Sequence, residues 1–502
     1  MSDSRSRRWF LKTAVTAGAT VGLGDLSFLG RLPRISAAEA DLDTKFVRFH
    51  ADIEPLVRFL EDTPRERLLE EVASRIHRGL TYRELLAALL LAGVRNIQPR
   101  PVGFKFHAVL VINSAHLASI SSPDKDRWLP IFWALDYFKS AQAQDVREGD
   151  WTMAAMDESK IPSPRKAKQA FLEAMDNWDE PAADAAISGL ARITGADELF
   201  EVFCRYGVRD FREIGHKAIY VANSWRTLQT IGWRHAEPVL RSLAYGLLDR
   251  GGDENPSKAD LAPDRPWRQN LGLTKKIRPE WQTGEISRAG SLELLHAMRE
   301  ASPEEASAKV VELLNRGIAP QSVWDGLFSA AGELLMSRPG ILSLHALTST
   351  NAIHFAFQNS GVDETRRLLM LQNAAFLSLF RTSEGKLKPV RLEQLQAQEN
   401  PPATLESIFA EISHDRMSAA RQVLSYLRKN PQPQEFINGA RRLVFLKGNN
   451  SHDYKFSSAV LEDYQNVSAE WRNQFLAASV FNLRGSGDKD NELVKRTRAA
   501  LG

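Results

Sequence analysis

Cysteine is almost absent from this chain of 502 residues, in which Cys204 stands alone. A single cysteine excludes an intramolecular disulfide, a cluster of thiolate ligands and a haem attached through a pair of cysteines. Long apolar runs are missing as well, because no stretch after the N-terminal segment offers the ~18 residues that a membrane span needs. With 43% hydrophobic and 25% charged residues, the composition is that of a globular protein of two or three structural units.

An excess of charge of one sign is also missing. Residues 1–40 hold six of the 65 Lys and Arg and three of the 62 Asp and Glu, which leaves 59 of each in the remainder. Since a polyanion partner requires a basic surface, we expect no nucleic-acid partner. The chain also lacks a serine-nucleophile motif, a glycine-rich phosphate loop and an HExxH helix, so nothing specific indicates a hydrolase, a kinase or a nicotinamide enzyme.

The first forty residues read as an export signal. Ser6 to Lys12 spell Ser-Arg-Arg-Trp-Phe-Leu-Lys, a close match to the twin-arginine motif, and a mildly apolar stretch and a small-residue run follow before Asp41. We predict that residues 1–40 are a signal peptide, that the twin-arginine machinery exports the chain to the periplasm, and that no stable membrane span persists after cleavage. An uncleaved anchor and a basic extension before a buried helix are the alternatives. Because this route carries folded proteins, often with cofactors inserted, it favours a bound metal.

The remainder of the chain has the pattern of an all-α protein. Apolar residues recur at three- and four-residue spacing in segments such as 65–78 and 81–94, and strand-type alternation is hard to find. We expect the second of these helices to start after Thr81, and we expect Gly79 and Gly93 to end the two helices.

A segment rich in proline and glycine divides the chain. We take residues 251–290 as a linker or loop between an N-terminal helical half, 41–250, and a C-terminal helical half, 291–502.

The strongest feature is an internal repeat. Residues 101–116 and 339–354 share a proline, a His-Ala pair, an asparagine and a final histidine at a constant offset of 238, and Arg78-Gly79 and Arg316-Gly317 keep the same offset. Agreement over so many sparse residue types indicates a duplicated helical unit.

The duplication extends to a second pair of units. His216 lies 109 residues after His107, and His452 lies 107 residues after His345. We therefore predict an internally duplicated helical protein with two pseudo-symmetric halves of two helical units each, every unit opening a helix with a histidine.

Four histidines, one from each unit, suit a metal on a pseudo-two-fold axis. Neutral imidazole is a good ligand for iron, copper, zinc and nickel, and two related halves supply two ligands each. We predict a metal site formed by His107, His216, His345 and His452, with non-haem iron as the first choice and zinc or copper as alternatives. The structural alternative is that these histidines only pack or cap helices.

Three further residues are candidate catalytic groups. His116 and His354 each follow a predicted ligand by nine residues, which on a helix is ~13–14 Å of rise and the opposite face, so one ion cannot take both members of such a pair. They would act on the substrate side or only pack. Lys455 shares the helix face of His452 and would act there as a base, an anion anchor or a carboxylated ligand.

Two segments resemble a known family. Gly215–Ile219 reads Gly-His-Lys-Ala-Ile, with Leu228 and Trp233 following, and is similar to the Gly-His-x-x-Ile segment of questin oxidase-like proteins. His345–Ser349 reads His-Ala-Leu-Thr-Ser and resembles their later His-x-Val-Thr-Ser segment.

The resemblance implies a helical fold, oxidative ring opening of aromatic polyketides and non-haem iron, with roles for His216 and His345. The family's later Trp-Lys-Gly-Arg-like segment is absent, and Leu371-Gln372-Asn373 stands near its place.

These observations lead to three functional hypotheses. The first is an exported metal-dependent oxidase or oxygenase that binds O₂ and an apolar or aromatic small molecule between the halves. The second is a non-catalytic periplasmic helical scaffold or binding protein, and the third is a zinc-dependent hydrolase or lyase.

Overall fold

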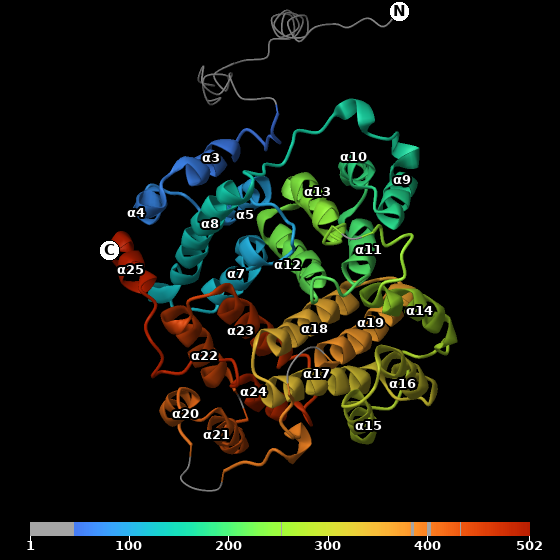
Figure 1. The fold of residues 1–502 in the computed structure, drawn as a ribbon. Helices are drawn as coiled ribbons and strands as arrows, with labels where there is room; N and C mark the ends of the chain where they lie inside the picture. The colour runs from blue at the N-terminus through green and yellow to red at the C-terminus, as the bar shows by residue number, and fades with distance from the viewer. Residues whose placement is uncertain (1–44, 253, 383–385, 399–402, 432) are drawn as a thin grey trace, which may run out of the picture. The chain divides into compact units, whose positions relative to one another are not determined.

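The computed structural model describes residues 45–502 except 253, 383–385, 399–402 and 432 (Figure 1). In this part of the chain the regular structure is helical, which confirms the all-α prediction, and β pairing is limited to isolated bridges such as Glu285–Ile318. Val47 to Gly502 form one compact unit, separate from Met1–Phe46. The predicted export signal lies outside the described residues.

The N-terminal half is a succession of helices joined by short loops. Its α-helices are α3 (Glu54–Asp62), α4 (Arg65–His77), α5 (Tyr82–Asn96), α6 (His107–Leu110), α7 (Ile112–Ile120), α8 (Leu129–Glu148), α9 (Pro164–Asn177), α10 (Glu180–Ala191), α11 (Ala196–Gly207), α12 (His216–Ile231) and α13 (Ala236–Leu247).

The C-terminal half follows the predicted linker. Its α-helices are α15 (Arg288–Met298), α16 (Pro303–Asn315), α17 (Pro320–Ser337), α18 (Ile341–Asn359), α19 (Asp363–Thr382), α20 (Leu405–Ile412), α21 (Arg416–Lys429), α22 (Gln434–Lys447), α23 (Ser451–Asp463), α24 (Arg472–Ser479) and α25 (Leu493–Leu501). The linker itself holds a further helix, α14 (Arg265–Leu273), which packs against α16 and α19.

Local signals set most of the predicted helix ends. Thr81 accepts a hydrogen bond from the backbone of Glu84 and forms a capping box with it, so α5 begins where the sequence predicts. Gly79 follows α4 with a φ of +103°, which suits a glycine after a helix end. The predicted stop at Gly93 is wrong, because α5 continues to Asn96. A Cβ atom at Gly93 would lie 2.8 Å from Cγ2 of Val109, so this glycine permits close helix packing instead.

Four helices pack in a ring in the middle of this unit. α12 contacts α18, α18 contacts α23, α23 contacts α7, and α7 contacts α12 (Figure 1). In α18 nearly every residue between Ser343 and Phe357 is buried, as expected for a helix that is surrounded by others.

Contacts between the ring helices show that they run in the same direction. The side chain of Asn223 in α12 donates to the carbonyl of Leu110. About two turns further along α12, the hydroxyl of Thr230 lies 3.4 Å from Nε2 of His116, which is likewise further along in α7. Arg226 of α12 likewise donates to Asn351 of α18, well after the starts of both helices. The amino-terminal ends of the ring helices therefore gather at one end of the ring.

The helix bounds repeat with the offset found in the sequence. α4 and α16 begin at residues 65 and 303 and end at 77 and 315, and both differences are 238. α5 and α17 begin at 82 and 320, again 238 apart. The repeated histidine segment differs in detail, since it is broken at Val111 between α6 and α7 but continuous in α18. The internal duplication stays a prediction that these bounds favour.

Candidate metal centre

The four predicted ligands lie at or near the amino-terminal ends of helices, three of them in ring helices and His107 in α6, the short helix that precedes ring helix α7. His107 is the first residue of α6, His216 the first of α12, His452 the second of α23 and His345 the fifth of α18. His107, His216 and His345 are buried, whereas His452 is half-buried. Because the ring helices run in one direction, this shared position brings the side chains to one end of the ring.

The structure brings the four imidazoles together in a four-sided array. Neighbouring ring centroids are separated by 4.9 Å for His107 and His216, 4.3 Å for His216 and His345, 5.2 Å for His345 and His452, and 4.8 Å for His452 and His107. The diagonal from His107 to His345 is longer, at 6.4 Å. The four sides are all shorter than this diagonal, so each imidazole has two neighbouring imidazoles and the four surround a common centre.

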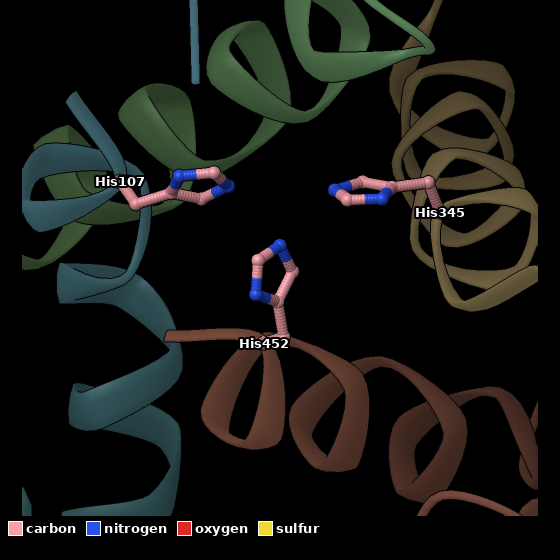
Figure 2. A group of neighbouring side chains, drawn as sticks. All are labelled: His107, His345 and His452. Atoms are coloured by element: carbon pink, nitrogen blue, oxygen red, sulfur yellow. The ribbon is translucent and has the colours of Figure 1, made fainter. Parts of the chain in front are cut away.

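Three of the four histidines offer ring nitrogens that are mutually close. Figure 2 shows His107, His345 and His452 pointing toward one another from three different helices. One ring nitrogen of each lies within 4.8 Å of the other two. His216 does not belong to this set of three, but it is joined to it through His107. Among the described residues, no aspartate or glutamate belongs to the group.

Backbone carbonyls fix the orientation of three rings. The Nδ1 atoms of His107, His216 and His345 lie 2.8, 2.8 and 2.7 Å from the carbonyl oxygens of residues 104, 213 and 341. A carbonyl oxygen can only accept, so each Nδ1 carries the proton and donates it. Each Nε2 is then left with a free lone pair, the arrangement found in metal-binding histidines.

The Nε2 atoms of His107 and His216 lie 3.0 Å apart. With both Nδ1 atoms protonated, two lone pairs face each other at this distance, and a proton or a cation between them is needed to relieve the repulsion. Two nitrogen ligands at right angles around an ion with bonds of about 2.1 Å are separated by about 3.0 Å. The pair therefore fits two neighbouring ligands of one metal ion.

Burial keeps these histidines neutral. It lowers the pKa of His107, His216 and His345 well below the usual value of 6.5, and the positive charge of Lys455 lowers each further. The same two causes lower the pKa of His452 to about 4. A neutral imidazole is the form that binds a metal, so near pH 7 the cluster is ready for an ion without losing protons.

Lys455 lies against the cluster. Its Nζ is 3.5 Å from Nε2 of His345, and its side chain is 2% exposed. Burial lowers the pKa of this amine to about 7. The sequence predicts Lys455 on the helix face of His452, and the structure places its Nζ against His345 of α18.

Strained backbone precedes two of the ligands. Phe104, whose carbonyl holds His107, has a φ of +45°, and Ile214, two residues before His216, has a φ of +43°. An apolar residue rarely adopts this left-handed conformation, which costs ~1–3 kcal/mol. The packing around the cluster must impose it, and the conformation turns the chain so that a carbonyl faces the following histidine.

His116 makes its hydrogen bonds with residues outside the four-histidine cluster. Its Nδ1 is 2.9 Å from the hydroxyl of Tyr82, and its Nε2 is 3.4 Å from the hydroxyl of Thr230. Both ring nitrogens therefore have partners away from the cluster, which agrees with the expectation that one ion cannot bind both His107 and His116.

His354 is enclosed by aromatic side chains. Its ring lies edge-on to Trp324 at 4.7 Å and to Phe328 at 5.1 Å, and its buried Nδ1 has no hydrogen-bond partner among the described residues. Burial lowers its pKa to about 3. This environment makes His354 a neutral packing residue two and a half turns from His345.

Sequence reasoning missed the groups that orient the ligands. The carbonyls of residues 104, 213 and 341 carry no residue-type signal, because any residue offers the same carbonyl. It also missed Glu213, where burial and then the charge of Asp249 raise the pKa of the carboxyl to about 7.

Comparisons of the whole chain with protein-family models, with curated proteins and with solved structures gave no match. The likeness to questin oxidase-like proteins thus consists of the two short segments that contain His216 and His345.

Proposed function

We propose that this protein is an exported, metal-dependent enzyme that oxidises an apolar or aromatic small molecule with O₂ at a non-haem iron held by His107, His216, His345 and His452. The observation that carries the proposal is the pair of Nε2 lone pairs that face each other at 3.0 Å while both Nδ1 atoms donate to carbonyls. A histidine cluster that only stabilised the fold would be expected to place a donor opposite each acceptor.

The number of imidazole ligands favours iron over zinc. Structural and catalytic zinc is commonly four-coordinate and tetrahedral, so four imidazoles would nearly saturate it. Four imidazole ligands leave one or two positions open on an ion that takes five or six ligands, and such positions are what O₂ or a substrate requires. Copper also accepts square arrangements of nitrogen ligands and is the alternative metal.

The residues of the chain would hold the ion, orient its ligands and exclude water. Bound iron would supply O₂ binding and electron transfer. The three carbonyl-anchored imidazoles keep their Nε2 atoms directed inward, and burial prevents bulk water from reaching most of the cluster.

An apolar rim supports a hydrophobic substrate. Phe104 is 72% exposed and Ile341 is 59% exposed, although both are large and apolar. The carbonyls of these same two residues hold His107 and His345, so the exposed side chains lie beside the cluster. Exposed apolar residues next to a polar site are typical of a ligand entrance.

The export proposal rests on the Arg7-Arg8 motif, which lies outside the described residues. In the part of the chain that the structure describes, no helix is both long and apolar enough to cross a membrane.

Metal analysis of the folded, exported protein tests the proposal. We would compare the wild type with the double variant His107→Ala/His345→Ala and with a matched control, His77→Ala/His414→Ala, which removes two exposed histidines. The expected result is one iron per chain in the wild type and in the control, and less than a tenth of that in the cluster variant. Nitric oxide added to the ferrous protein should then give the electron paramagnetic resonance signal of an iron–nitrosyl complex, which requires an open position.

The other outcomes separate the alternatives. One zinc per chain that is lost in the cluster variant would favour the hydrolase or lyase hypothesis. No metal in the wild type after expression with metals supplied would overturn the enzyme proposal and favour a helical scaffold or binding protein.

A further inference from the structure

Lys455 differs from the other buried lysines in lacking a strong partner. Lys217 donates to both carboxylate oxygens of Asp210, Lys105 pairs with Asp145 at 2.8 Å, and Lys139 donates to two carbonyls. Among the described residues, Nζ of Lys455 has a single polar contact, Nε2 of His345 at 3.5 Å, which is longer than an ordinary hydrogen bond. A buried amino group without a partner is costly unless a ligand provides one.

Lys455 also breaks the repeat. It lies three residues after His452, one turn further into the ring on the same helix face. The equivalent positions after His107, His216 and His345 hold Leu110, Ile219 and Thr348. Those side chains are buried and cannot carry a charge, so only one of four otherwise related positions brings an amino group to the cluster.

The four-histidine cluster contains no negatively charged ligand among the described residues. Four neutral imidazoles bring no charge, and the metal group contains no carboxylate among the described residues. The amino-terminal ends of three α-helices of eight or more residues begin within five residues of their histidine, and each end adds a fraction of a positive charge. A divalent cation in this buried place would therefore need an anion from outside the chain.

We infer that the metal centre takes an exogenous carboxylate, whose one oxygen faces the metal and whose other accepts a hydrogen bond from Nζ of Lys455. This inference rests on the proposed metal site. A carboxylate fits because it supplies the missing negative charge and has two acceptor oxygens for two different partners. An N–H of Lys455 donates to it whether the amine carries two protons or three.

Two kinds of molecule carry such a carboxylate, a small free acid and a substrate with a carboxyl group. A small free acid would use only the metal and Lys455, whereas the carboxyl group of a substrate would add contacts of an apolar part with the protein. Acetate and phenylacetate represent these two cases, and imidazole serves as a neutral ligand that needs the metal but not the amino group.

Titration calorimetry on the metal-loaded protein tests the inference, after the metal content of every sample has been measured. The variants are Lys455→Met, which keeps the length of the side chain and removes the donor, Lys455→Arg, which keeps a donor, and Lys139→Met as a matched buried-lysine control. Loss of one hydrogen bond to a charged group predicts acetate binding about 10- to 100-fold weaker in Lys455→Met. We expect imidazole binding within about threefold of the wild type in all variants, and partial recovery of acetate binding in Lys455→Arg.

Each outcome has a distinct meaning. A wild type that binds no metal refutes the proposed function itself. Metal-loaded wild type that binds imidazole but not acetate, or Lys455→Met that binds acetate as tightly as the wild type, refutes the carboxylate inference and leaves the metal site intact. Phenylacetate binding at least tenfold tighter than acetate assigns the carboxylate to a substrate, and equal affinities assign it to a small free acid.

Discussion

The ion pair of Lys217 and Asp210 underlies the orientation of His216. Nζ of Lys217 lies 2.9 and 2.8 Å from the two carboxylate oxygens of Asp210 and 2.7 Å from the carbonyl of Asp249, and the two charged side chains are 1% and 0% exposed. Asp210 lies in the loop between α11 and α12, which also carries Glu213, whose carbonyl accepts from Nδ1 of His216. The ion pair therefore positions this loop, and the loop orients the imidazole of His216.

Lys217→Met would leave the carboxylate of Asp210 buried without its cation. Removing one partner of a buried ion pair typically costs about 3–5 kcal/mol, because the remaining charge keeps its desolvation penalty. We expect a loss of this size in the free energy of unfolding, measured by urea denaturation of the metal-free protein near pH 7. The loop should also loosen, so metal affinity should fall as well.

Two further variants make this prediction specific. Lys217→Met combined with Asp210→Leu removes both charges and should recover most of the lost stability, as apolar replacements of buried pairs often do. Lys309 forms partly exposed ion pairs with Glu293 and Glu312, so Lys309→Met should lower the free energy of unfolding by less than about 1 kcal/mol. A loss below about 1 kcal/mol in Lys217→Met would refute the reasoning.

Three other predictions concern Gly215, His354 and the Arg7-Arg8 motif. A Cβ atom at Gly215, where φ is +80°, would lie 2.6 Å from a side-chain atom of α18, so Gly215→Ala should reduce both the free energy of unfolding and the metal affinity. The control Gly79→Ala has a φ of +103° and no atom within 4 Å of the new Cβ, so in the same unfolding assay it should show only the backbone strain of about 1 kcal/mol. The pKa of His354 is about 3 in the folded state and 6.5 in the unfolded state, so the unfolded state binds the proton first and stability falls as the pH drops from about 6.5 toward 3. His354→Phe should reduce this loss of stability by about 2–3 kcal/mol at about pH 4.5. A stability difference between wild type and variant that stays constant across this pH range would contradict the prediction. Arg7→Lys combined with Arg8→Lys should keep the protein in the cytoplasm in cell fractionation, and normal export of this variant would refute the twin-arginine prediction.

The sequence determined the helical class and the identity of the clustered histidines. Both are local or repetitive properties, since the spacing of apolar residues sets a helix and its face, and caps such as Thr81 set its start. The repeat offset of 238 selected His107 and His345, and the spacings of 109 and 107 residues added His216 and His452. The structure brings these four of the 11 histidines together.

Only the tertiary structure decided how these histidines are held. The carbonyls that take the Nδ1 protons come from loops whose path depends on neighbouring helices, including the left-handed residues Phe104 and Ile214. The role of Gly93 was also decided by the tertiary structure. This glycine leaves room for Val109 of α6 and does not end α5. That no carboxylate of the described residues pairs with Lys455 is likewise a property of packing, since the charges that surround a buried amine come from residues far apart in the sequence.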